Sequence, residues 1–133
     1  MIPNRRAGII RRDAIRILEN RGYQVIPVDC SAIAGCLPVH LLGLKGESEL
    51  LHVWLKRSIH EITSDAVIES FCADEIRQFR KMVATDPGKI RPRYEIWVSQ
   101  PSGRFCGIEV LPDRLIDVGS YSRERDHPAG GQL

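Results

Sequence analysis

Residues 11–23, with the sequence RRDAIRILENRGY, decide the fold class that we expect for this chain. Apolar residues recur every three to four positions along this stretch and just before it, which predicts one buried stripe of a helix. They are Ala7, Ile10, Ala14, Ile17 and Leu18. Asn4 is placed to cap the start of the helix, and Gly22 ends it. A short strand over residues 23–28 follows, in which Pro27 is tolerated only at a sheet edge or a strand end.

The middle of the chain predicts a hairpin and then a long helix. Two apolar runs, residues 37–44 and 50–55, flank the polar turn Lys45-Gly46-Glu47-Ser48, which is typical of a hairpin. Apolar residues then recur at helical spacing over residues 64–84, so we expect one amphipathic helix that is capped by Thr63 or Ser64.

The last third predicts a second strand pair, residues 94–99 and 105–111, joined by Gln100-Pro101-Ser102-Gly103. Residues 115–118 are expected to add a short strand or a turn. The order α-β-β-β-α-β-β implies a mixed central sheet of about five strands, flanked by helices on its faces. At 133 residues and 43% hydrophobic content, we expect one α/β domain over residues 1–118 and a flexible tail over residues 119–133.

Composition excludes several classes of protein. The apolar runs are too short to span a membrane, and no uninterrupted apolar segment follows Met1, so we expect no membrane partner, no secretory signal and a cytoplasmic location. The four cysteines form no C-x-x-C pair, and we expect reduced thiols and no metal site.

The positive charge is concentrated at the start of the chain. Residues 1–21 hold six arginines against two acidic residues, a formal charge of +4, which leaves −2 for the rest of a chain whose total is +2. The arginines are Arg5, Arg6, Arg11, Arg12, Arg16 and Arg21, and the first five of them are the ones that we expect to bind nucleic acid. Such a segment suits contact with DNA or RNA, because phosphate binding depends on local positive charge. A solvated helix face is the alternative explanation.

The helix that ends in Arg21-Gly22-Tyr23 resembles the opening helix of archaeal Holliday-junction resolvases and related PD-(D/E)XK, or restriction-endonuclease-like, proteins. The hairpin and the strand Tyr94-Glu95-Ile96-Trp97-Val98 continue the resemblance, which covers about residues 5–118. It implies a three-layer fold with a mixed sheet between helices.

In that family an Asp on the second strand and a Glu-x-Lys pair on the third hold Mg²⁺ and activate water, because a hard cation takes oxygen ligands. The lysine position falls on Lys56, the Glu position on Trp54 and the Asp position on His40. An acidic residue that many relatives carry on the first helix falls on Arg11. Both metal-binding carboxylates are therefore replaced, and we expect neither a metal nor another cofactor.

Migrated acids are the alternative. Glu69, on the helix after the lysine, and Asp29, after the first strand, are candidates to rebuild a Mg²⁺ site with Lys56. The resemblance thus leaves three functions open: a nucleic-acid-binding or assembly domain without catalysis, a metal-dependent endonuclease with a rearranged site, and a homodimeric structural subunit with no nucleic-acid role. We expect the first.

Overall fold

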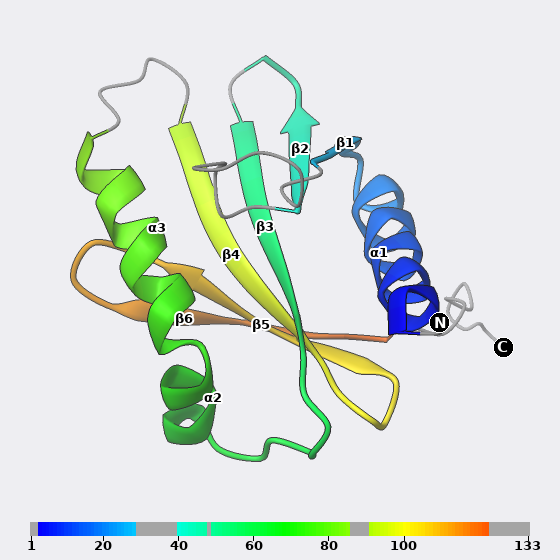
Figure 1. The fold of residues 1–133 in the computed structure, drawn as a ribbon. Coiled ribbons are helices and arrows are strands. Elements are labelled where there is room, and N and C mark those ends of the chain that lie inside the picture. Colours follow the sequence, from blue (N-terminus) through cyan, green and yellow to red (C-terminus); the bar gives the residue numbers. More distant parts are fainter. Residues whose placement is uncertain (1–2, 29–39, 48, 86–90, 123–133) are drawn as a thin grey trace, which may run out of the picture.

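The computed structural model of the chain describes residues 3–28, 40–47, 49–85 and 91–122, and Figure 1 shows its elements. The first helix, α1 (Pro3–Asn20), starts one residue before the expected cap Asn4. Proline fits the first turn of a helix, because the N–H that it lacks has no partner inside the helix there. Gly22, with a φ of 95°, lets the chain turn out of α1 toward the sheet.

In the described part of the chain, six strands form one sheet in their sequence order. They are β1 (Gln24–Pro27), β2 (Leu41–Lys45), β3 (Glu49–Arg57), β4 (Arg91–Ser99), β5 (Arg104–Val110) and β6 (Leu115–Ser122). Among the strand pairs of the described residues only β3–β4 is parallel, so the sheet is mixed as expected, with one described strand more than the expected five. A parallel pair needs a long crossover, and the helices between β3 and β4 supply it.

The structure confirms the expected place of Pro27 and the expected hairpin turn after β2. Pro27 is the last residue of β1, which is an edge strand of the sheet, and the β2–β3 hairpin turns at Gly46 with a φ of 65°.

The last strand is longer than expected. β6 runs to Ser122, so the first four residues of the expected tail, 119–122, pair with β5. Residues 123–133 lie outside the described part of the chain.

The expected single helix over residues 64–84 is wrong in one respect. Ser64 does cap the start, since its Oγ accepts a hydrogen bond from the Val67 N–H at 3.2 Å. The helix is interrupted at Cys72, however, and is divided into α2 (Asp65–Phe71) and α3 (Ala73–Thr85). The apolar spacing continues across the break, so the sequence pattern gives no sign of it.

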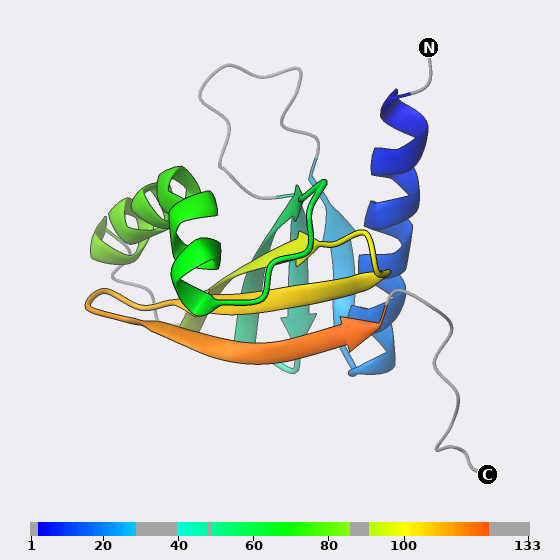
Figure 2. The ribbon, with the colours of Figure 1, turned by 90° about the horizontal axis from the view of Figure 1, so that it is seen from below.

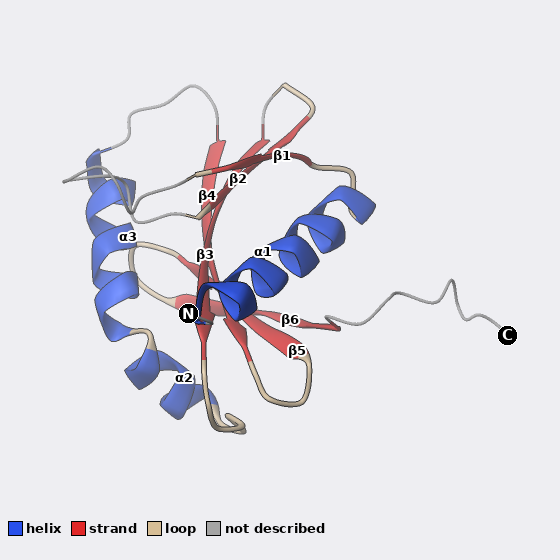
Figure 3. Ribbon diagram, turned by 45° about the vertical axis from the view of Figure 1, so that its right-hand side comes forward, coloured by secondary structure: helices blue, strands red, loops and turns tan. Residues whose placement is uncertain are grey.

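The helices cover opposite faces of the sheet, α1 one face and α2 with α3 the other (Figures 1 and 2). In Figure 3, α1 crosses in front of the strands. The α1 core joins Ile10, Ala14, Ile17 and Leu18 to the sheet. The core on the other face joins Ile68, Cys72, Ile76 and Phe79 to it. Among the described cysteines, Cys72 and Cys106 are free thiols, and no described helix is long and apolar enough to cross a membrane.

Candidate functional site

The residues at the two substituted acidic positions lie side by side. His40 directly precedes β2, and its backbone N–H donates to the Val53 carbonyl of β3 at 3.0 Å, which sets it across from Trp54. The two rings meet nearly at right angles, at 70°, with centroids 5.3 Å apart. The hairpin therefore brings positions 40 and 54 together on one face, as the resemblance implies.

His40 is held as a neutral imidazole. Its Nδ1 atom accepts a hydrogen bond from the Leu55 backbone N–H at 3.0 Å, so the ring proton is on Nε2. Burial lowers the pKa of His40 below its ordinary value, and the positive charge of Arg11 lowers it further. A neutral ring with one nitrogen already occupied is a poor ligand for Mg²⁺, which takes oxygen atoms.

Trp54 joins the sheet to α3. Its indole is half-buried and packs edge-on against the fully buried ring of Phe79, with centroids 6.3 Å apart and an angle of 83°. The indole therefore contacts the hairpin through His40 and α3 through Phe79. Trp54 is thus part of the core between sheet and helix.

Lys56 is engaged in structural contacts. Its Nζ donates to the Phe71 carbonyl at 2.5 Å and to Glu75 Oε1 at 2.9 Å, and it lies 4.2 Å from the centroid of the Phe71 ring. Phe71 is the last residue of α2, where helix carbonyls have lost their partners, so a cation is stabilising there. Lys56 and Glu75 are only 24% and 13% exposed. The lysine thus holds the break between α2 and α3.

The acid that reaches Lys56 is one that the sequence did not identify. Glu75 makes the ion pair, whereas Glu69 is exposed on α2 and lines a pocket with Asp65. Asp29 lies outside the described residues. Which acid faces Lys56 on β3 depends on how α3 is oriented after Cys72. The break at Cys72 changes this orientation from that of one continuous helix.

Three of the five arginines expected to bind nucleic acid have described side chains. Arg12 is exposed, while Arg11 and Arg16 are half-buried, and Arg16 lies 3.9 Å from Asp13. Arg5 and Arg6 belong to the first turns of α1. Positions 12 and 16 are four residues apart, so they share the side of the helix that faces away from the core. That side of α1 is basic.

A second polar cluster, on the α1 face, was not foreseen. The Arg93 guanidinium binds three carboxylates from three neighbouring strands: Glu49 at 3.0 Å, Glu95 at 3.0 Å and Glu109 at 3.2 Å. Alternation along β4 gives the signal that could have revealed it, because Arg93, Glu95 and Trp97 fall on the same face of that strand. Each carboxylate binds the same guanidinium, so the cluster is internally paired.

Glu95 is the most unusual member of this cluster, because its side chain is completely buried. Its Oε1 atom accepts from the Trp97 indole N–H at 2.9 Å. Burial raises the pKa of Glu95 above its ordinary value, against the lowering effect of Trp97 and Arg93. At the edge of the cluster Tyr23 donates to Glu49, and burial together with that carboxylate raises the pKa of Tyr23 to about 12.

Among solved structures, the fold is similar to that of Hjc, a Holliday junction resolvase from the archaeal hyperthermophile Archaeoglobus fulgidus. The TM-score is 0.54, the sequence identity is 15%, and the match covers 85% of each chain. No protein-family model matches the sequence, and no curated protein is significantly similar to it. The expected resolvase-like α/β fold is confirmed.

Proposed function

We propose that this chain is a nucleic-acid-binding domain that has a nuclease fold and does not hydrolyse its ligand. The contact between His40 and Trp54 carries the proposal. In the family that the chain resembles, these two positions supply the oxygen ligands of the metal. Here they supply an imidazole, whose Nδ1 is occupied, and an indole, which offers no oxygen at all.

The residues around Lys56 do not fit a magnesium ion. One carboxylate, Glu75, lies beside the lysine, and it is already paired with the Nζ atom. In the described ranges no three His, Cys, Asp or Glu side chains are grouped so that they could hold a metal. One acid supplies too few of the oxygen atoms that Mg²⁺ requires, so we derive no hydrolytic step through a metal here.

Two observations support a nucleic-acid ligand. The arginine-rich side of α1 faces away from the core, so its charge is available to a polyanion. A solved structure with a similar fold is a Holliday junction resolvase, whose name refers to a branched DNA. DNA is therefore the first ligand to test, with RNA second.

Fluorescence anisotropy with a labelled four-way junction, a duplex and a single strand tests the proposal. We expect binding that weakens steeply with salt, because each phosphate contact releases counterions. The double variant Arg12→Gln/Arg16→Gln should lower the salt slope by about one to two. Arg77→Gln/Arg104→Gln removes the same charge from exposed positions elsewhere and should change the slope much less. If none of the three ligands binds at low salt, the proposal is contradicted.

The ion pair between Lys56 and Glu75 favours a second candidate, a metal-dependent endonuclease with a rearranged site. Glu75 lies on the second of the two helices after the lysine strand, whereas the sequence indicates Glu69 on the first of them as the migrated acid. This candidate requires junction cleavage with Mg²⁺ or Mn²⁺ that both Lys56→Ala and Glu75→Gln abolish. If the Glu75→Gln variant still cleaves the junction, this second candidate is wrong.

Self-association and location remain predictions. Light scattering on the purified chain distinguishes a monomer from a homodimer, and the structural-subunit alternative requires a dimer that binds no nucleic acid. A cytoplasmic location is likewise part of the proposal.

A further inference from the structure

Arg11 differs from the exposed arginines of α1, because it lies at the margin of the buried stripe. It precedes Ile15 by four residues and Leu18 by seven, so the three share one side of the helix. Leu18 is completely buried, and Ile15 packs against the core beneath α1. Arg11 is half-buried as a result, whereas Arg12 is exposed. The Arg11 side chain therefore starts beside the sheet and not on the far side of the helix.

This margin of α1 lies beside the start of β2. Ile10 of α1 packs in one core with Leu41 of β2 and Val53 of β3, which pair across the hairpin. His40 directly precedes Leu41 in the chain. Burial lowers the pKa of His40, and the charge of Arg11 lowers it further. The packing of α1 and this electrostatic effect both place the Arg11 guanidinium near the imidazole.

Arg11 and His40 both have hydrogen-bond donors that the described part of the protein does not use. No described residue forms a hydrogen bond or an ion pair with the Arg11 guanidinium. His40 Nδ1 accepts from the Leu55 N–H at 3.0 Å, so the proton is on Nε2, and no described residue accepts it. Water or a ligand must therefore supply the acceptors. A cationic donor next to a neutral donor is the chemistry that recognises an anion.

We propose that the Arg11 guanidinium and the Nε2–H of His40 together bind one phosphate of the nucleic-acid backbone. The inference rests on the proposed function and names the place at which the ligand is held. A guanidinium offers N–H donors in a fixed plane, which suits the oxygen atoms of a phosphate. The neutral imidazole adds a donor without adding charge. In the family that the chain resembles, a metal would supply the positive charge near position 40, and here Arg11 supplies it.

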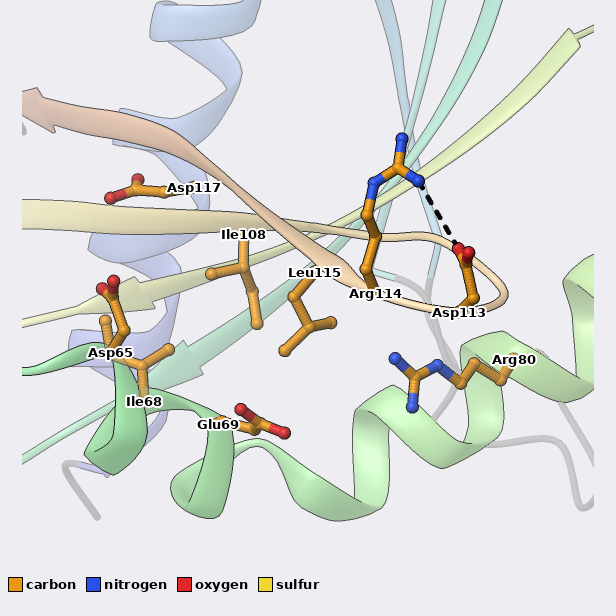
Figure 4. A pocket seen from close by; sticks show the side chains of 9 residues that line it. All are labelled: Asp65, Ile68, Glu69, Arg80, Ile108, Asp113, Arg114, Leu115 and Asp117. Atoms are coloured by element: carbon orange, nitrogen blue, oxygen red, sulfur yellow. Dashed lines mark ion pairs between the residues drawn. The ribbon is translucent and has the colours of Figure 1, made fainter.

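A pocket of about 440 Å³ beside α2 does not suit this ligand. Four acidic residues and two arginines are among the described residues that line it. Figure 4 shows Asp65, Glu69 and Asp117 around its apolar side chains, and Arg114 paired with Asp113. The excess of carboxylates repels a phosphate. We therefore expect the nucleic acid to approach Arg11 and not this pocket.

Anisotropy titrations with the nucleic acid that the wild type binds most tightly test the site. Arg11→Gln should weaken binding about tenfold and lower the salt slope by about one, since one phosphate contact is lost. His40→Asn keeps an acceptor for the Leu55 N–H and removes the Nε2–H, so the affinity should fall severalfold at an unchanged salt slope. The control Arg104→Gln removes the same charge as Arg11→Gln from an exposed position and should weaken binding less than about threefold.

A double-mutant cycle tests whether the two donors contact the same phosphate. In the Arg11→Gln background, His40→Asn should weaken binding less than about twofold, because the phosphate is no longer held beside the imidazole. In the Arg104→Gln background it should have its full severalfold effect. Equal effects of His40→Asn in the two backgrounds overturn the proposal. An Arg11→Gln protein whose affinity and salt slope match those of Arg104→Gln also overturns it.

The unfolding midpoint of each variant shows whether it is folded. Arg11→Lys keeps the test available if His40→Asn is not, because lysine retains the charge and lacks the planar set of donors. Its salt slope should equal that of the wild type while its affinity falls about threefold or more, and an unchanged affinity overturns the proposal. If the wild type binds none of the three nucleic acids, the proposed function fails as well. If it binds and the two donors act independently, only the shared phosphate site is wrong.

Discussion

The imidazole of His40 and the indole of Trp54 lie edge to face across the β2–β3 hairpin, with centroids 5.3 Å apart. Aromatic pairs of this geometry contribute about 0.5–1.5 kcal/mol beyond the area they bury. In a nuclease of the family that the chain resembles, two carboxylates would repel each other at these positions unless a cation lay between them. Here the same two positions stabilise the fold.

The low pKa of His40 predicts that part of the stability is lost in mild acid. Burial disfavours the protonated ring in the folded protein, so the unfolded chain takes up a proton first as the pH falls below the ordinary histidine value of 6.5. The free energy of unfolding should therefore decrease between pH 7.5 and pH 5, and His40→Asn should reduce that decrease. Urea denaturation across this range measures it. An equal reduction by His60→Asn, at an exposed position, contradicts the prediction.

The structural role of Lys56 predicts a stability loss on substitution. Lys56→Met leaves the largely buried Glu75 carboxylate and the Phe71 carbonyl without their cation, which should cost about 2 kcal/mol. A double-mutant cycle with Glu75→Leu should show coupling of about 1 kcal/mol or more.

The exposed Arg77–Asp74 pair provides the control for this cycle, and its coupling should be about 0.5 kcal/mol or less. Chemical denaturation at pH 7 gives both values. If the two pairs couple equally, Lys56 does not have the structural role described.

Much of the fold was predictable because local signals agreed with the final packing. The apolar stripe of α1, the turn at Gly46 and the strand end at Pro27 each specify one local structure, and the structure has all three. The break at Cys72 was not predictable, because a tertiary contact accompanies it: the Lys56 amine binds the carbonyl of Phe71.

The candidate site was predictable only in part. The two-residue repeat of strands and the hairpin register bring positions 40 and 54 to one face, so their proximity could be inferred. The partner of Lys56 could not, because it depends on how α3 is oriented after the break. Of the two acids Glu69 is the nearer to Lys56 along the chain, whereas Glu75 makes the contact.

The buried Glu95 predicts a stability change of opposite sign to that of His40. The raised pKa means that the folded protein holds the proton of Glu95 more tightly than the unfolded chain does. Glu95 therefore stabilises the folded protein fully below pH 4.5, the ordinary value, and this contribution is lost as the pH rises through the pKa of the folded protein. Glu95→Gln should gain stability relative to the wild type as the pH increases above 4.5. Unfolding curves from pH 4.5 to pH 8 measure the difference, with the exposed Glu19→Gln as the control for net charge. If the stability of Glu95→Gln relative to the wild type decreases as the pH rises, the prediction is wrong.

Two glycines predict opposite effects of the same substitution. A Cβ at Gly8, inside α1, meets nothing within 4 Å, so Gly8→Ala should stabilise the protein by up to about 1 kcal/mol through helix propensity. A Cβ at Gly107 would lie 2.7 Å from Val118 Cγ2 and 3.4 Å from Trp97 Cδ1, so Gly107→Ala should destabilise it by about 1–3 kcal/mol. Thermal unfolding compares them, and a stable Gly107→Ala protein would mean that β6 does not pack on β5 as described.

One assay tests the central claim most directly: a labelled four-way junction is incubated with the protein and Mn²⁺, and the complex and any cleavage products are measured in the same samples. Binding without catalysis predicts a salt-sensitive complex that Arg12→Gln/Arg16→Gln weakens, with the junction intact. Metal-dependent cleavage that disappears in Lys56→Ala, while that variant still binds, would contradict it.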